Sequence, residues 1–271
     1  MAPPLMRWLP CGSFATMPRR RAGTEMNLEL SLIRAIGRAL PPIRGSTALI
    51  NRVLKPIYLR KPRSAVTATV LGFKMTLDPA QAVDGGLLFY PQLFNRQELR
   101  WVRTFLRPTD TFVDAGAYIG AFSLVASDIT RQVIAIEANP IVFPTLLANI
   151  QANGRSIEAV SAGISDKRET LVFYVQNRGN LGGSSFVGQN SGQRFEVECK
   201  PLHELAPAAD FIKLDIEGME HRVLGAYFQH HKPRVLILEN NEADRAVVDM
   251  CREQGYHVAG RTIENVLLLR D

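Results

Sequence analysis

Residues 111–139 constrain the fold more strongly than any other part of the chain. This segment opens with an apolar run that ends at Asp114, passes through a turn bracketed by Gly116 and Gly120, and continues in residues that can start a helix. A β-branched run then ends at Glu137. A strand, a glycine turn, a helix and a second strand ending in a carboxylate are typical of one half of a nucleotide-binding sheet.

The rest of the chain repeats this alternation of strands and helices. Further strands are predicted at 157–164, 211–216, 234–239, 256–259 and 265–269. Helices are predicted at 97–106, from 139 to about 153, from 218 to 228 and at 243–254. The alternation predicts an α/β fold with a doubly wound, mostly parallel sheet that binds ligands at the carboxyl ends of its strands.

Two β-hairpins interrupt this succession. The first covers 66–77 and is followed by a break between elements at residues 85–86, which are both glycine. The second is an inserted hairpin with arms at 171–175 and 195–200, joined by the glycine-rich residues 179–192. That connection either folds over an acceptor or serves as a flexible linker.

The basic residues gather at the N-terminal end. Of 32 Lys and Arg residues, 12 fall within 1–63 beside only two acidic residues, whereas 64–271 holds 20 basic and 24 acidic residues. The net charge of +6 therefore belongs to the N-terminal arm, and this distribution argues against nucleic acid as a partner of the core. We divide the chain into a disordered leader at 1–26, a basic helical extension at 27–63 and a main domain at 64–271.

The extension contains a predicted amphipathic helix at 27–40. Its apolar positions at helical spacing are Leu28, Leu32, Ala35, Ile36 and Ala39. Arg34 and Arg38 fall on another face of the same helix. Such a helix either docks on the domain or lies on the surface of an anionic membrane.

Cysteine usage and hydropathy indicate the compartment. Cys11, Cys199 and Cys251 are odd in number and widely spaced, so neither a disulfide framework nor a zinc site is predicted. No uncharged apolar run reaches the roughly 18 residues that span a bilayer. We therefore expect a cytoplasmic protein in a reducing environment.

The spacing of the glycine turn discriminates between nucleotide cofactors. A dinucleotide-binding site has the motif GxGxxG, whereas here Asp114 is followed by Gly116 and then by Gly120. An acid in this turn repels a pyrophosphate but suits a ligand that carries a sulfonium and an amino group. Glu137, 21 residues after Gly116, is placed to accept hydrogen bonds from both ribose hydroxyls. The pattern favours S-adenosylmethionine.

An ordered series of motifs extends this interpretation from about residue 66 to the C-terminus. The series is FVDAGAYIGAFSL, VIAIEANP, SAGISDKRETLVFYV, GGSSF, DFIKLDIEGMEHRVLGA and PRVLILEN. With these motifs the sequence resembles the FkbM family of S-adenosylmethionine-dependent methyltransferases. The resemblance implies a class I methyltransferase (Rossmann-like) fold with a seven-stranded sheet, and methylation of a hydroxyl oxygen in secondary metabolites or sugars.

The resemblance also implies roles for individual residues. Asp114, Gly116 and Gly120 would hold the methionine part of the cofactor, Glu137 the ribose, and Ser165 with Asp166 the adenine. The candidate cofactor-binding set further includes Ala117, Tyr118 and Ala138, and Glu98 matches a family position that borders the cofactor. The family commonly has Asn in place of Tyr118, and this bulkier side chain bears on the geometry of the turn.

Asp215, Glu217 and His221 are the candidates for acceptor positioning or catalysis. Methyl transfer is an in-line displacement, so the protein chiefly aligns the reactants and removes the acceptor proton. Capping of the next helix is the alternative role for these carboxylates. No metal is included in the predicted site, although Mg²⁺ held by Asp215, Glu239 and Asn240 is an alternative.

These observations predict an S-adenosylmethionine-dependent methyltransferase that O-methylates a small molecule or sugar, with no nucleic acid as a partner. The alternatives are a nicotinamide-dependent oxidoreductase of the same sheet type and a non-enzymatic module that binds a membrane or partner. Peripheral contact with an anionic membrane through the basic arm is compatible with each of them.

Overall fold

The computed structural model describes residues 28–41, 43, 45–176, 179–186, 193–216, 218–239 and 245–271. The predicted leader at 1–26 lies outside these residues, as do Cys11, Glu217 and Asn240. Among the helices within the described ranges, none has the length and apolar character needed to span a lipid bilayer.

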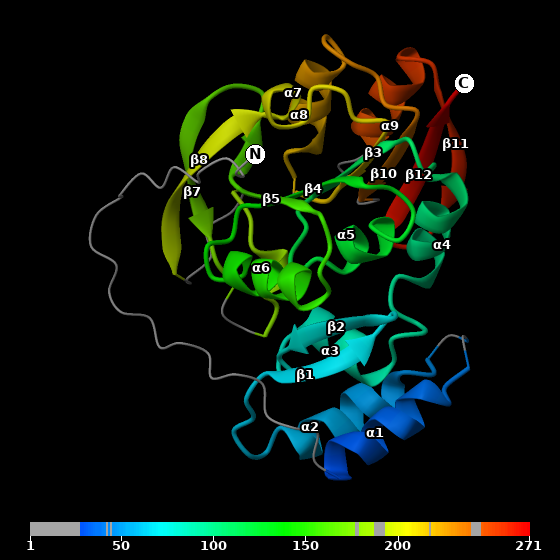
Figure 1. The fold of residues 1–271 in the computed structure, drawn as a ribbon, viewed down its shortest axis with the longest axis vertical. Helices are drawn as coiled ribbons and strands as arrows, with labels where there is room; N and C mark the ends of the chain where they lie inside the picture. The colour runs from blue at the N-terminus through cyan, green and yellow to red at the C-terminus, as the bar shows by residue number, and fades with distance from the viewer. Residues whose placement is uncertain are drawn as a thin grey trace.

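A seven-stranded sheet forms the centre of the fold (Figure 1), in the order β11-β12-β10-β9-β3-β4-β5. Its strands are β3 (Thr111–Ala115), β4 (Gln132–Glu137), β5 (Glu158–Ser161), β9 (Phe211–Leu214), β10 (Val235–Glu239), β11 (Tyr256–Arg261) and β12 (Asn265–Arg270). The five strands from β5 to β10 are parallel, while β12 runs antiparallel to β10 and β11. The predicted doubly wound, mostly parallel sheet is confirmed.

Alternating side chains of these strands build a core on each face of the sheet. Phe112 and Phe211 pack with the helices on one face, and their neighbours Val113 and Ile212 pack on the other. The first face is covered by α4 (Arg96–Phe105), α5 (Ala121–Ala126) and α6 (Phe143–Ala152), and the second by α8 (Glu220–Tyr227) and α9 (Arg245–Glu253). The carboxyl ends of the parallel strands are thereby held at one edge of a rigid layer.

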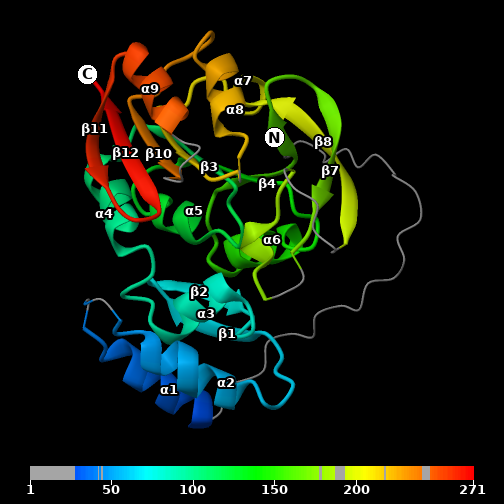
Figure 2. The ribbon, with the colours of Figure 1, turned by 180° about the vertical axis from the view of Figure 1, so that it is seen from behind.

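The N-terminal residues form a layer at one end of the molecule, as both ribbon views show (Figures 1 and 2). Its elements are α1 (Leu28–Arg38), the π-helical turn η1 (Ile50–Leu54), α2 (Lys55–Tyr58), the hairpin β1 (Val66–Val70) and β2 (Phe73–Leu77), and α3 (Ala82–Phe89). The predicted hairpin is confirmed by its antiparallel register, in which Val70 pairs with Phe73. This layer shares one continuous core with the first face of the sheet.

Two expectations about this layer are wrong. The residues Gly85 and Gly86 do not break the chain but lie buried within α3, where Gly86 packs beside the Phe94 and Tyr90 rings and a Cβ on Gly85 would overlap the Lys55 ammonium. Helix α1 docks through Leu30 and Ile33 rather than through the predicted apolar face. The docking side is set by Gly37, because a Cβ there would overlap the carbonyl oxygen of Phe89 in α3.

The inserted hairpin is part of a separate three-stranded sheet. Its arms are β7 (Glu169–Tyr174) and β8 (Arg194–Pro201), and β6 (Gly163–Ser165) pairs parallel to β8. The single strand predicted at 157–164 is therefore wrong, since the chain leaves the main sheet after Ser161 to form β6. Gly163 allows the change of sheet, because a Cβ there would overlap the Cys199 thiol and the Phe186 ring. Two short helices complete the description, η2 (Leu181–Gly183) and α7 (Leu202–Leu205).

Candidate functional site

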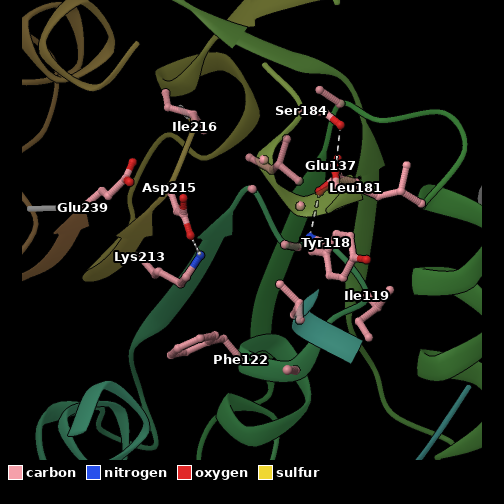
Figure 3. A pocket seen from close by; sticks show the side chains of 18 of the residues that line it. Tyr118, Ile119, Phe122, Glu137, Leu181, Ser184, Lys213, Asp215, Ile216 and Glu239 are labelled. Atoms are coloured by element: carbon pink, nitrogen blue, oxygen red, sulfur yellow. Dashed lines mark hydrogen bonds and ion pairs between the residues drawn. The ribbon is translucent and has the colours of Figure 1, made fainter. Parts of the chain in front are cut away.

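A cavity of about 360 Å³ lies at the carboxyl ends of β4, β3, β9 and β10 (Figure 3). Its volume falls within the range of roughly 300–1,000 Å³ that is usual for small-molecule sites. Of the predicted cofactor residues, those that line the cavity are Gly116, Ala117, Tyr118, Glu137 and Ala138. The glycine turn and the strand that ends in a carboxylate thus meet at one cavity, as the topology of such sheets requires.

Asp114 lies directly behind the cavity wall and ties the end of β3 to α5. Its Oδ2 atom accepts hydrogen bonds from the amide and the hydroxyl of Ser123, at 3.0 and 2.6 Å. Its Oδ1 atom has no hydrogen-bond donor among the described residues and lies 3.6 Å from the ammonium of Lys213. Burial raises the pKa of Asp114, against the opposing effects of Lys213 and Ser123.

The glycine turn brings two strand ends into close contact. Gly116 has a φ of +80°, and a Cβ on it would overlap the carbonyl oxygen of Asp215 at the end of β9. Gly120, with a φ of +88°, precedes α5 and packs against Leu146. Tyr118 also has a positive φ, of 52°, a conformation in which Asn is enriched. The positive φ explains why Asn suits position 118 of the motif.

Glu137 is the buried carboxylate of the site. Its two oxygens accept hydrogen bonds of 2.7 Å from the backbone amides of Tyr118 and Asn139. Burial raises its pKa to about 7, although both amides act in the opposite direction. Because a carboxylate offers about four lone-pair positions, Glu137 retains acceptor capacity for a ligand.

Lys213 is a buried ammonium between two carboxylates. It projects from β9, lies 3.1 Å from Asp215 Oδ2 and faces the Phe122 ring at 5.2 Å. Burial alone would lower the pKa of Lys213, but Asp215 and Asp114 outweigh burial and raise it. Lys213 therefore stays charged and links the ends of β3 and β9 electrostatically.

The opposite side of the cavity is polar and acidic, and Figure 3 shows Asp215 and Glu239 there, away from Glu137. Glu264 and Asn265 line the same side. Sequence reasoning missed these two, although β12 is antiparallel and its first residue, Asn265, pairs with Glu239 at the end of β10. A terminal antiparallel pair in the predicted topology was the signal that could have identified them.

Glu98 supports this acidic side from behind. It is buried in α4, and its Oε1 atom accepts hydrogen bonds from Thr262 Oγ1 at 2.6 Å and from Asn265 Nδ2 at 3.3 Å. Glu98 does not itself line the cavity but holds a residue that does.

Three other predicted residues do not line the cavity, and a fourth, Glu217, lies outside the described residues. His221 is exposed on α8. The Ser165 hydroxyl donates to Glu169, and Asp166 pairs with Arg222 at 2.6 Å, which lowers the pKa of Asp166. The cavity wall near them is instead apolar, and it consists of Ala162, Ile164, Phe173 and Phe186.

Residues 179–186 form a further wall beside Glu137 and Tyr118. The Gly179 carbonyl accepts from the Ala82 amide at 2.7 Å, and the Leu181 amide donates to Gln81 Oε1 at 2.9 Å. The Ser184 hydroxyl donates to the Leu181 carbonyl at 2.8 Å (Figure 3). This part of the predicted glycine-rich connection is therefore anchored to the start of α3.

In the described part of the chain, no three His, Cys, Asp or Glu side chains are grouped to hold a metal ion. The magnesium set of Asp215, Glu239 and Asn240 stays an alternative from the sequence, since Asn240 lies outside the described residues.

The sheet order, the glycine turn at the end of β3 and the carboxylate at the end of β4 define a class I methyltransferase fold. The profile described as Methyltransferase FkbM domain matches residues 114–258, which is more than half of the chain. The protein belongs to this FkbM methyltransferase family, and S-adenosylmethionine is the cofactor of the family and of this chain. No curated protein sequence matches the chain significantly.

The solved structures that are similar to this chain have low sequence identity and TM-scores below 0.5. Trm5b from Pyrococcus abyssi is 15% identical with a TM-score of 0.46, covering 75% of this chain and 54% of that one. Precorrin-6y C5,15-methyltransferase from Geobacter metallireducens is 15% identical with a TM-score of 0.42, covering 66% and 87%. TYW2 from M. jannaschii in complex with AdoMet is 14% identical with a TM-score of 0.45, covering 79% and 90%. The chain spans about half the length of the first of these, and similarity at this level does not identify a substrate.

Proposed function

We propose that the protein transfers a methyl group from S-adenosylmethionine to a hydroxyl oxygen of a small acceptor, such as a sugar or a secondary metabolite. The observation that carries this proposal is the pair of carboxylates, Asp215 and Glu239, across the cavity from Glu137. Carboxylates accept hydrogen bonds from hydroxyl groups and can remove their protons.

The cavity suits the methyl donor on its Glu137 side. Glu137 would accept the ribose hydroxyls, and Gly116 would let the methionine part approach the backbone beside Asp114. The apolar wall of Ile164, Phe173 and Phe186 supports an adenine position here, rather than at the predicted Ser165 and Asp166. Bound S-adenosylmethionine would supply a methyl carbon activated by the adjoining positive sulfur.

Asp215 is our candidate for the group that takes the acceptor proton. Its side chain is 40% exposed, and its Oδ2 atom is held 3.1 Å from Lys213. Lys213 would keep the carboxylate oriented, and Glu239 would position the acceptor through a second hydrogen bond. Glu217 remains a candidate from the sequence alone, whereas the exposed position of His221 does not favour a catalytic role.

The charge of the acceptor side favours a small hydroxylated molecule over nucleic acid. Asp215, Glu239 and Glu264 would repel phosphate groups. The predicted cytoplasmic location is part of this proposal, supported by Cys199 and Cys251, which are free thiols. Membership of a methyltransferase family favours methyl transfer over the nicotinamide-dependent alternative.

The test is methyl transfer from radiolabelled S-adenosylmethionine to a panel of sugars, polyols and hydroxylated aromatic compounds. With an active acceptor, Asp215→Asn should lower kcat by roughly 100-fold or more, with little change in the KM for S-adenosylmethionine. Asp249→Asn is the matched control, because this carboxylate is exposed on α9 and does not line the cavity.

Two results would contradict the proposal. If NMR of the product shows the methyl group on nitrogen or carbon, O-methylation is ruled out. Binding of S-adenosylmethionine without transfer to any acceptor would favour the non-enzymatic alternative.

A further inference from the structure

We propose that the N-terminal helices dock the protein onto the surface of an anionic lipid bilayer. The docking surface, called the N-terminal face below, contains six exposed apolar side chains: Leu28, Leu32, Ile43, Leu49, Val53 and Ile57. In the described residues, the only other large apolar side chains with comparable exposure are Val172 and Ile263. Exposed apolar surface is thus concentrated in one short stretch, which is unusual for a surface that faces only water.

Helical spacing gathers these side chains into stripes. Leu28 and Leu32 are 87% and 62% exposed and stand one turn apart on α1. Leu49, Val53 and Ile57 recur at intervals of four through η1 and α2, and each is about half exposed. These stripes are not part of the protein core, because the helices pack against it through other residues: Leu30, Ile33, Ile50 and Tyr58.

The charges around the stripes are positive. Arg52, Arg60 and Lys61 are exposed and form no ion pair with any residue that the structure describes. Glu29 is the only acidic residue from position 28 to 63, and it is bonded to Arg63 at 2.5 Å. An apolar stripe flanked by unneutralised basic residues is the pattern of helices that lie in the interface of an anionic membrane.

Other occupants fit this face less well. A second copy of the chain would bring the same basic residues together, at an electrostatic cost. The helices of this face are too short to span a bilayer, since α1 has 11 residues where about 20 are needed. A flat surface can reach them, because both views show α1 and α2 at one end of the molecule (Figures 1 and 2).

Flotation of the full chain with vesicles tests the proposal. The protein should bind phosphatidylcholine vesicles that contain phosphatidylglycerol, bind pure phosphatidylcholine vesicles far less, and be released by high salt. Leu28→Ser and Leu32→Ser should each weaken partitioning roughly tenfold. Ile263→Ser is the matched control, because this side chain is 90% exposed between β11 and β12, outside the N-terminal face.

A second comparison separates this face from general attraction between a basic protein and anionic lipid. Arg52→Gln with Lys61→Gln should weaken binding by roughly fivefold per charge, whereas Arg100→Gln with Arg103→Gln, exposed on α4, should change it little. Circular dichroism should show an unchanged fold in every variant, since each replaced side chain is exposed.

Three results would overturn the proposal. The first is no binding to anionic vesicles at low salt. The second is an equal loss in the Ile263→Ser or α4 variants. The third is a dimer that light scattering detects in the wild type and that Leu28→Ser and Leu32→Ser dissociate, which would assign the face to a second copy.

Discussion

Replacing Glu137 with glutamine should remove a large part of the pH dependence of stability between about pH 5 and pH 8. The carboxylate is 7% exposed, and burial raises its pKa from 4.5 to about 7 despite the amides of Asn139 and Tyr118. Glutamine is nearly isosteric and cannot ionise, but its one acceptor oxygen can serve only one of the two amides, so the effect of the charge is measured by the pH slope and not by the absolute stability.

The magnitude follows from the difference in pKa between the two states. Between 4.5 and about 7 the native chain holds a proton on Glu137 that the unfolded chain has lost. The stability that the protonated Glu137 side chain contributes is fully present below its pKa in the unfolded chain. It is lost as the pH rises to its pKa in the folded chain. At about 1.4 kcal/mol per pKa unit, the ionised carboxylate lowers the free energy of unfolding by roughly 3 kcal/mol at pH 8.

Urea denaturation of the wild type and of Glu137→Gln at a series of pH values measures this effect. The free energy of unfolding should fall by roughly 3 kcal/mol more in the wild type than in the variant as the pH rises from about 5 to about 8. Glu253→Gln, an exposed glutamate on α9, is the control and should keep the wild-type slope. Parallel curves for the wild type and Glu137→Gln would refute the reasoning.

Three other substitutions test the turn and the buried ion pair. Gly116→Ala should lower the free energy of unfolding by more than the roughly 1–2 kcal/mol expected for Gly72→Ala, because a Cβ would overlap backbone at Gly116 but meets open space at Gly72, and equal losses in denaturation would contradict this. Lys213→Met should lower the free energy of unfolding by roughly 3 kcal/mol by leaving Asp114 without its cation, and adding Asp114→Asn should recover part of the loss in the same assay. Tyr118→Asn should raise Tm by a few degrees in calorimetry, because Asn tolerates the positive φ, and a lower Tm would show that the ring's packing outweighs the backbone strain.

The cofactor half of the fold could be predicted because its signals are local. The turn that follows Asp114 needs glycine at 116 and 120 for their positive φ values, and the strand before Glu137 is an apolar run rich in β-branched residues. The residues that determine these elements lie within one segment of the chain, so the sequence pattern of that segment alone indicated a strand, turn, helix and strand.

Features decided by packing between distant segments could not be predicted in the same way. Gly85 and Gly86 predict a break in the chain, yet both lie buried in α3, where Gly85 faces the Lys55 side chain and Gly86 faces the Phe94 ring, and both of these residues lie outside the helix. The docking side of α1 depends on its contact with α3, and the sequence of α1 is apolar on more than one side. Glu264 and Asn265 reach the acceptor side through the register of β10 with β12, which the predicted order of strands suggests but no single segment of the chain contains.

Isothermal titration with S-adenosylmethionine most directly tests the central claim that the cavity beside Glu137 binds this cofactor. At about pH 8, above the Glu137 pKa of about 7, the wild type should bind one equivalent, and Glu137→Ala should bind at least tenfold more weakly because the ribose hydroxyls lose a charged acceptor. Glu253→Ala should bind like the wild type. No binding by the wild type, or equal affinity in Glu137→Ala, would contradict the account.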